Sequence, residues 1–239
     1  MTMTPEISVV VPFFNEAESA HDVVQGIVSA LTSAGVSFEV LLIDDGSTDQ
    51  TLAVLLGARQ QWPQCRVLRQ SRNSGQAAAL LSGFRRANGR LIVTLDGDGQ
   101  NDASDIPAMI RLLDGADMVV GIRIGRKDSG LRRAMSRIAN TIRGRWLGDH
   151  VSDSGCALKV FRREVMESFM PLRTLYSFMP AFAVSRGYKV VECPVRHHPR
   201  VKGTSKYGLR KMLWRPAVDM LALGWILRQI VARVDAEEQ

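Results

Sequence analysis

The strongest constraint on the fold is the alternation of short apolar runs with segments of helical spacing in the first half of the chain. The runs of strand type are ISVVVPFF (7–14), FEVLLID (38–44), RVLRQ (66–70), LIVTL (91–95) and DMVVGIR (117–123). Helices are expected in 17–33, after STDQT (47–51), in 73–86 and in 104–113. This order predicts an α/β fold in which helices cover both faces of a mostly parallel sheet. Strands in such a sheet are buried on both sides, which explains why the runs are almost wholly apolar.

The length of 239 residues suits one larger α/β domain with a short appendage. We expect residues 1–208 to form the main domain and 209–239 to form a C-terminal amphipathic helical segment. The three cysteines are widely spaced and match no disulfide or zinc pattern, which predicts free thiols in a reducing cytoplasm. No basic region precedes the first apolar run, so no signal peptide is expected.

Polar residues follow three of the predicted strands directly. These segments read PFFNE (12–16), DDGSTD (44–49) and DGDGQND (96–102). Ligands of open parallel sheets gather at the carboxyl ends of the strands, so the three segments are expected to meet in one site. The sequence contains no G-x-x-x-x-G-K-[ST] and no G-x-G-x-x-G in its first β-α turn, which excludes a P-loop and a dinucleotide-binding fingerprint.

Two carboxylates stand close together in the third segment, at Asp96 and Asp98. A hairpin turn would also place Asp beside Gly, but a helical pattern follows here rather than a returning strand. An EF-hand loop fails, because Asn101 stands where Gly is needed and Pro107 where Glu is needed. The remaining interpretation is a partial site for a divalent cation, which takes its other ligands from water and substrate phosphates. The cation would offset the repulsion between the two acids.

Basic residues are concentrated in two segments of a chain whose formal net charge is +7 and whose pI is near 9.8. Residues 123–147 hold eight Lys or Arg against one acid, and residues 193–218 hold seven against none. Segments of this kind favour phosphate-bearing partners, which could be a nucleotide, a nucleic acid or an anionic membrane.

From Ile7 to about Trp214 the chain resembles the family 2 glycosyltransferases, which have a GT-A fold and an Asp-x-Asp motif. More narrowly, it resembles the polyprenyl-phosphate sugar synthases of the dolichol-phosphate mannosyltransferase group. The motifs that carry the resemblance are VVVPFFNE, VLLIDDGSTDQT, NSGQAAALLSGFRRANG, TLDGDGQNDASDIP, GIR, RRAMSR and HHPRVKGTSKYG, in this order. The resemblance implies Mg²⁺ or Mn²⁺ as cofactor.

The resemblance also assigns roles to individual positions. It implies nucleotide binding by Pro12, Phe14, Asn15, Glu16, Asp44, Asp45 and Asp96. It implies metal and diphosphate binding by Asp96, Asp98 and Gln100, with Asp98 among the catalytic residues. It implies phosphate or acceptor binding by Arg123, Arg132, Ser136, Arg200, Ser205 and Lys206, three of which (Arg123, Arg132 and Arg200) also count as catalytic. Independently, Arg132 and Ser136 are four residues apart, so on a helix both could reach one phosphate.

The implied reaction is an inverting transfer of a hexose from GDP-mannose or a UDP-sugar to a polyprenyl phosphate. A lipid phosphate is already an anion at neutral pH, because its second pKa lies near ~6, so no strong base is required. A sugar hydroxyl acceptor would need a carboxylate base, for which Asp153 is the candidate. Two other classes stay open: a basic nucleic-acid-binding module and a nucleotidyltransferase. Aromatic residues make up only 6% and no RNA-binding signature occurs, so we expect no nucleic-acid partner.

The apolar run PAVDMLALGWIL (216–227) is too short to span a bilayer. With Trp214, Trp225 and flanking basic residues, it suits a helix that lies in the membrane interface, or alternatively one that packs on the core. We therefore expect a cytoplasmic protein, peripheral on the inner face of the membrane, with a possible separate membrane-spanning partner. The basic loop 196–215 is expected to close over the site when substrates bind. His197 and His198 are neighbours in a strand-like segment and would point to opposite faces, so they are not expected to chelate one ion.

Overall fold

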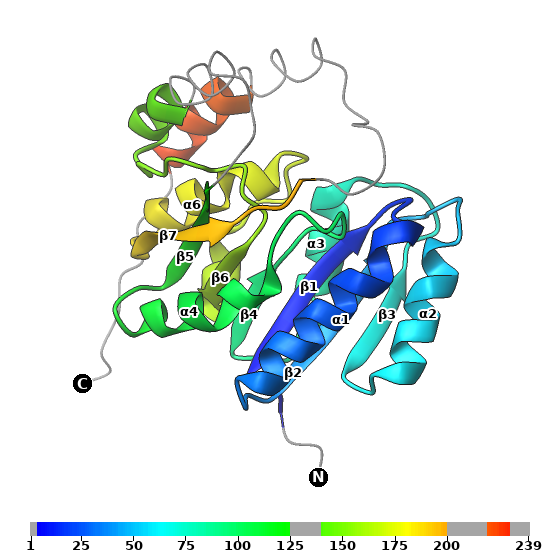
Figure 1. Ribbon diagram of the computed structural model, residues 1–239. Coiled ribbons are helices and arrows are strands. Elements are labelled where there is room, and N and C mark those ends of the chain that lie inside the picture. Colours follow the sequence, from blue (N-terminus) through cyan, green and yellow to red (C-terminus); the bar gives the residue numbers. More distant parts are fainter. Residues whose placement is uncertain (1–3, 125–139, 200–218, 230–239) are drawn as a thin grey trace, which may run out of the picture.

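The computed structural model describes residues 4–124, 140–199 and 219–229 (Figure 1). Its strands are β1 (Ile7–Phe13), β2 (Phe38–Asp44), β3 (Cys65–Arg69), β4 (Leu91–Thr94), β5 (Met118–Ile124), β6 (Lys159–Arg162) and β7 (Val190–Arg196). Its α-helices include α1 (Ala17–Ser33), α2 (Thr51–Gln61), α3 (Gln76–Phe84), α4 (Ile106–Arg111) and α6 (Leu175–Ser185). Three 3₁₀ turns are η1 (Ala103–Asp105), η2 (Leu112–Asp114) and η3 (Arg163–Ser168). Residues 140–147 and 219–227 are also helical.

In the described part of the chain the strands form one seven-stranded sheet with the order β3-β2-β1-β4-β6-β5-β7. All neighbouring strands are parallel except for β6, which is antiparallel to both β4 and β5. The predicted mostly parallel α/β sheet is therefore confirmed. The order places β1 between β2 and β4, so the segments that follow these three strands leave the same edge of the sheet.

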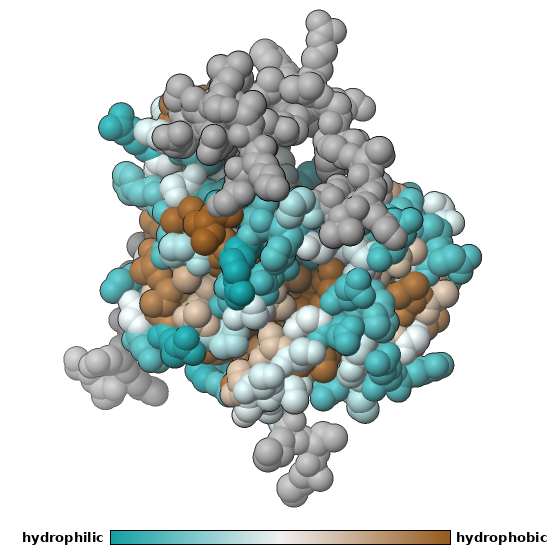
Figure 2. All heavy atoms as spheres, in the orientation of Figure 1, coloured by the Kyte–Doolittle hydropathy of each residue, from teal (hydrophilic) through white to brown (hydrophobic). Residues whose placement is uncertain are grey.

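The core is divided by the sheet into two layers. Val9 and Val11 of β1 face the layer beneath α1, α2 and α4, whereas Val10 faces the layer beneath α3 and α6. Every one of these three side chains is buried, as expected for a strand covered on both faces. On the face seen in Figure 2 the described residues are mostly hydrophilic, with hydrophobic residues in patches among them.

Two predicted helices have different limits in the structure. The segment 104–113 is not one helix: η1, α4 and η2 follow one another there. The helix expected in 73–86 begins only at Gln76, because the backbone of Gly75 has φ 92°, a left-handed conformation suited to glycine. The C-terminal helix is described over 219–227, where Leu223 is buried against the α6 layer. The proposed domain boundary at 208/209 lies outside the described residues.

Candidate active site

The segments after β1 and β2 are joined by hydrogen bonds, which places the first two predicted site loops together. The Asn15 side-chain oxygen accepts from the backbone N–H of Thr48 at 2.8 Å, and the Asn15 N–H donates to Ser47 Oγ at 3.1 Å. The Glu16 N–H donates to Thr51 Oγ1 at 2.9 Å. Asn15 has φ 53°, so its loop turns sharply away from the strand. Pro12 is the residue of β1 that pairs with Ile43 of β2, and Phe14 is partly buried next to this turn.

Asp45 fixes the start of α3. One of its oxygens accepts from the Ser74 N–H at 2.8 Å, and the other accepts from the Gly75 N–H at 2.9 Å and from Asn73 Nδ2 at 3.1 Å. Burial raises the pKa of Asp45 and the charge of Asp44 adds to this, although the two backbone hydrogen bonds act in the opposite direction. Both oxygens of the Asp45 carboxylate thus already accept hydrogen bonds from residues 73–75. Contact between Asp45 and a nucleotide base remains a prediction.

Asp44 lies at the end of β2 and is fully buried. Its Oδ1 accepts from the Ser47 N–H at 3.1 Å, while its Oδ2 has no hydrogen-bond partner among the described residues. The adjacent Gly46 has φ +68°, and a Cβ there would lie 2.4 Å from the carbonyl carbon of Arg72. Gly46 therefore allows the loops after β2 and β3 to approach closely.

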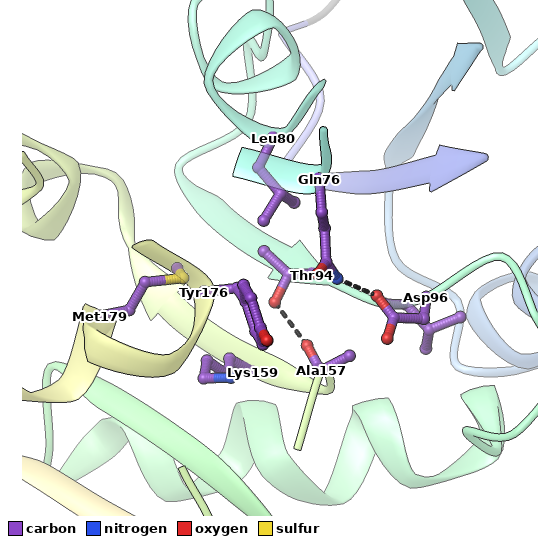
Figure 3. A pocket seen from close by; sticks show the side chains of 9 residues that line it. Gln76, Leu80, Thr94, Asp96, Ala157, Lys159, Tyr176 and Met179 are labelled. Atoms are coloured by element: carbon purple, nitrogen blue, oxygen red, sulfur yellow. Dashed lines mark hydrogen bonds between the residues drawn. The ribbon is translucent and has the colours of Figure 1, made fainter. Parts of the chain in front are cut away.

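The pair Asp96 and Asp98 follows β4, as predicted. The carboxylate of Asp96 accepts a hydrogen bond of 2.5 Å from the Gln76 side chain, which reaches it from the first turn of α3 (Figure 3). Burial and the negative charge of Asp98 raise the pKa of Asp96 to about 6, despite the nearby cations Lys159 and Arg123. Asp98 is partly exposed, and its Oδ1 accepts from the Gln100 N–H at 3.1 Å. The two carboxylates therefore repel each other, and Asp98 is partly exposed to solvent, where a cation could reach it.

The loop that carries the two acids is fixed on its other side by β1 and α1. Ser19 of α1 donates a hydrogen bond of 2.8 Å to the Gly97 carbonyl oxygen. A Cβ at Gly97 would lie 2.3 Å from the ring of Phe13, so only glycine fits between the acids without a shift. This contact gives a packing reason for the Gly of the Asp-Gly-Asp sequence.

A small pocket lies beneath Asp96, between α3, β4, β6 and α6 (Figure 3). Its lining residues are Gln76, Leu80, Thr94, Leu95, Asp96, Ala157, Lys159, Tyr176 and Met179. Lys159 is almost completely buried there, and its ammonium donates to the carbonyl oxygens of Cys156 and Ser154. Burial lowers the pKa of Lys159, and the charge of Asp96 acts in the opposite direction.

Sequence reasoning missed both Gln76 and Lys159. The one available signal was the position of Gln76 in NSGQ (73–76), in the segment that links a strand to the following helix. Lys159 begins β6, which carried no strand signal.

Arg123 and Asp153 form a bidentate ion pair. Arg123 Nε and Nη2 donate to the two oxygens of Asp153 at 2.8 and 2.7 Å, and the Arg123 N–H donates to the same carboxylate at 3.1 Å. Burial alone would lower the pKa of Arg123, but the hydrogen bond and charge of Asp153 outweigh it and raise the pKa. Asp153 is itself buried. This geometry holds Arg123 rigidly near Asp96 and occupies the carboxylate that was the candidate base for a hydroxyl acceptor.

The segment after β7 contacts the acidic loop. Asn101 forms an antiparallel bridge with His197, and the His198 N–H donates to the Gln100 carbonyl oxygen at 2.8 Å. The Gln100 side-chain nitrogen lies 3.5 Å from both His197 Nε2 and the His198 carbonyl oxygen, so only its oxygen could face an ion. His198 Nε2 is 3.3 Å from Asp102. The two imidazole rings thus face different side chains, that of His197 facing Gln100 and that of His198 facing Asp102.

Five predicted site residues lie outside the described part of the chain, as does most of the loop 196–215. They are Arg132, Ser136, Arg200, Ser205 and Lys206. Their roles remain predictions.

The residues present fit a divalent cation of the Mg²⁺ or Mn²⁺ type. Asp96 and Asp98 supply hard oxygen ligands, and because burial and the charge of Asp98 raise the pKa of Asp96, a bound cation would favour the ionised pair. In the part of the chain that the structure covers, no cluster of three or more His, Cys, Asp or Glu side chains could hold an ion. An ion here would therefore take its remaining ligands from a diphosphate and water.

The sheet order and the acidic pair after β4 identify the fold as GT-A, the class of nucleotide-sugar transferase folds. Similar solved structures support this assignment of the fold. A mannosyltransferase from Pyrobaculum calidifontis, solved with GDP-Man and Mn²⁺, matches with a TM-score of 0.66 and 22% identity over 97% of this chain and 67% of that one. Glucosyl-3-phosphoglycerate synthase from Mycobacterium tuberculosis, solved with Mg²⁺ and uridine diphosphate, matches with a TM-score of 0.71 and 19% identity over 92% and 79%. These likenesses concern the fold.

The chain belongs to glycosyl transferase family 2, whose sequence profile matches residues 8–169. It is 38% identical to undecaprenyl-phosphate 4-deoxy-4-formamido-L-arabinose transferase from Edwardsiella ictaluri over 87% of this chain and 64% of that protein. It is also 38% identical to dodecaprenyl-phosphate galacturonate synthase from Rhizobium johnstonii over 93% and 68%. The predicted resemblance to polyprenyl-phosphate sugar synthases is confirmed. The chain spans about two thirds of the length of these relatives.

Proposed function

We propose that this protein transfers a sugar from a nucleotide-diphosphate donor to a polyprenyl phosphate, with inversion at the anomeric carbon. The observation that carries the proposal is the Asp96–Asp98 pair at the edge where the segments after β1, β2 and β4 meet, with Asp96 held by Gln76. The names of both relatives describe sugar transfer to a polyprenyl phosphate, which supports the same acceptor class here.

On the donor side, the segments 12–16 and 44–49 would hold the nucleoside, and Asp96 and Asp98 would hold Mg²⁺ or Mn²⁺ on the diphosphate. When bound, the cation would stabilise charge on the departing nucleotide. Gln76 orients the Asp96 carboxylate, because its hydrogen bond occupies one oxygen and leaves the other for a ligand.

On the acceptor side, the ion pair of Arg123 and Asp153 favours a phosphate over a hydroxyl. A general base must reach the proton that it removes, and Asp153 is buried under three hydrogen bonds from Arg123. An acceptor phosphate needs no such base, since it is already an anion. It needs cations that offset the repulsion between two phosphate groups, and we give this role to Arg123, together with Arg132 and Arg200, which lie outside the described residues.

The identity of the donor depends on its sugar and its nucleotide base. The sequence resemblance favoured GDP-mannose or a UDP-sugar, whereas the two relatives are named for a formamido-arabinose and a galacturonate. We propose a nucleotide-linked hexose or a modified pyranose of this kind as donor. No described helix is both long and apolar enough to cross a bilayer. We further propose that the protein acts peripherally on the inner face of the membrane, where a nucleotide sugar would be available.

The test is a panel of labelled UDP- and GDP-sugars, including a uronic acid and an amino-pentose, with Mn²⁺ and a short-chain polyprenyl phosphate. We expect one donor to deliver label to the organic phase. If no donor labels the lipid while the same preparation binds nucleotide and metal, the proposed acceptor class is wrong.

A further inference from the structure

A buried lysine lies directly beneath the acidic pair. Lys159 begins β6 and stands between its register partners, Thr94 of β4 and Val120 of β5. It is 1% exposed and lines the small pocket below Asp96 that Figure 3 shows. Burying an ammonium group costs free energy unless hydrogen bonds and nearby opposite charges compensate it, so the position of this lysine calls for an explanation.

The ammonium group of Lys159 holds one loop of the chain. It donates hydrogen bonds to the carbonyl oxygen of Cys156 and, at 3.5 Å, to that of Ser154. The hydroxyl of its neighbour Thr94 donates to the carbonyl oxygen of Ala157 at 2.7 Å (Figure 3). Two adjacent side chains of the sheet therefore hold three carbonyl groups of the same loop.

This loop, residues 153–157, is also the platform for Arg123. Asp153 accepts three hydrogen bonds from Arg123, two from its guanidinium and one from its backbone N–H. A Cβ at Gly155 would lie 3.2 Å from Arg123 Nη2, so the guanidinium passes close to the loop backbone. The Asp153 N–H donates to Glu192 of β7 at 3.3 Å, which fixes the near end of the loop. The far end is the part that the two sheet side chains hold.

The surroundings of Lys159 exclude direct contact with a substrate. The pocket that it lines encloses about 10 Å³, roughly the space of one water molecule and too little for a sugar or a phosphate. A role as nucleophile or phosphate ligand is therefore excluded for Lys159 in this structure. Burial lowers its pKa, and the charges of Asp96 and Asp153 oppose this effect. The lysine thus lies between an acid of the donor side and an acid of the acceptor side.

We propose that Lys159 is a positioning residue for the acceptor side of the site. Lys159 fixes the 153–157 loop, and through Asp153 the loop aligns Arg123 with the acidic pair. A lysine suits this role because one ammonium group on a long apolar stem supplies several donors and reaches the loop from the middle of the sheet. The inference rests on the proposed function only in giving Arg123 a phosphate to bind.

The first test follows Arg123 without any acceptor. In a proton–nitrogen NMR spectrum of the full chain, the Nε–H of Arg123 is assigned by its loss in Arg123→Met. The variant Lys159→Met keeps the apolar stem and removes the ammonium group. We expect it to speed hydrogen exchange of the Arg123 Nε–H by about 10-fold or more, because Asp153 is then held less firmly.

Arg163→Met is the matched control. Arg163 likewise donates to two backbone carbonyl oxygens, that of Gly89 at 2.9 Å and that of Ala87 at 2.7 Å. These residues precede β4, whereas the acidic pair follows it, so the control removes the same kind of contact at the opposite edge of the sheet. We expect exchange of the Arg123 Nε–H to change less than about 2-fold in this variant.

The second test is a double-mutant cycle for transfer, in detergent, to a short-chain polyprenyl phosphate. Lys159→Met should lower kcat/KM for the lipid acceptor by about 10- to 100-fold, while the affinity for UDP or GDP with Mn²⁺ changes less than about 3-fold. In the Arg123→Met background the same substitution should cost less than about 3-fold, because the residue that it positions is then absent. Thr94→Val removes one hydroxyl at nearly equal volume and should act in the same direction as Lys159→Met.

An unchanged Arg123 Nε–H in Lys159→Met, or in Thr94→Val where the lysine variant does not fold, would overturn the inference. So would a loss of transfer that is equally large in the Arg123→Met background or in Arg163→Met. Absence of transfer by the wild type would count against the proposed function, and the exchange measurement would still decide whether Lys159 positions Arg123.

Discussion

Replacing Asp96 by Asn should stabilise the ligand-free protein while it abolishes transfer. Burial and Asp98 raise the pKa of Asp96 from its ordinary value of 3.8 to about 6, and Lys159 and Arg123 offset only part of this effect. Between these two values the folded state binds more protons than the unfolded state, so stability falls as the pH rises through this window. At pH 7.5 the Asp96 carboxyl group is ionised in the folded state, so the whole reduction in the free energy of unfolding is present. Asn carries no charge and can still accept the hydrogen bond from Gln76.

The size of the effect follows from the same pKa. A change from 3.8 to about 6 corresponds to about 3 kcal/mol at neutral pH. Asp96 is partly exposed, and solvent screening reduces this value, so we expect Asp96→Asn to gain about 1–2 kcal/mol. The gain should become smaller at pH 5, where the wild-type carboxyl group is largely protonated in the folded state.

The assay is urea unfolding of both proteins in EDTA at pH 7.5 and pH 5. Addition of Mn²⁺ with a nucleoside diphosphate should then stabilise the wild type and leave Asp96→Asn nearly unchanged. A variant that is less stable than the wild type at both pH values would refute the reasoning, because Asp96 would then serve the fold rather than a ligand.

Three further substitutions test separate parts of the account. Asp98→Ala should remove transfer with an unchanged melting temperature, as should excess EDTA in the wild type; activity in either case would contradict the metal assignment. Asp153→Asn should lower the free energy of unfolding by about 1–3 kcal/mol, because Arg123 loses a charged partner, and should slow transfer less than about 10-fold. A loss of ~10³-fold at unchanged stability would instead identify a general base. Gly97→Val should cost about 1–3 kcal/mol in urea unfolding, because its side chain would overlap the ring of Phe13; no loss would show that the loop can move away.

The strands β1, β2, β4 and β5 could be predicted because they are mostly buried and therefore mostly apolar. The edge strand β3 is only partly buried and contains two arginines, so its signal was weaker. The strand β6 could not be predicted in the same way. It has four residues, begins with Lys159, and is defined by its antiparallel pairing with β4 and β5. Such pairing joins residues that are far apart in the chain, and no local pattern encodes it.

The candidate site also combines residues that the local sequence predicts with residues whose role depends on contacts between distant segments. Asp96 and Asp98 could be placed because they follow a recognisable strand directly. The role of Gln76 depends on α3 beginning opposite β4, and the ion pair of Arg123 with Asp153 joins residues 30 positions apart. Asp153 was therefore a reasonable candidate base from the sequence, and its partner becomes visible only in the fold.

The most direct test of the central claim is a comparison of two acceptors that differ only in the phosphate. The wild-type protein would be given its labelled donor, Mn²⁺, and either a polyprenyl phosphate or the corresponding polyprenol. The account predicts that label enters the lipid only with the phosphate, and that the anomeric coupling in the NMR spectrum shows inversion relative to the donor. Transfer to the polyprenol at a comparable rate, or a product with retained configuration, would contradict it.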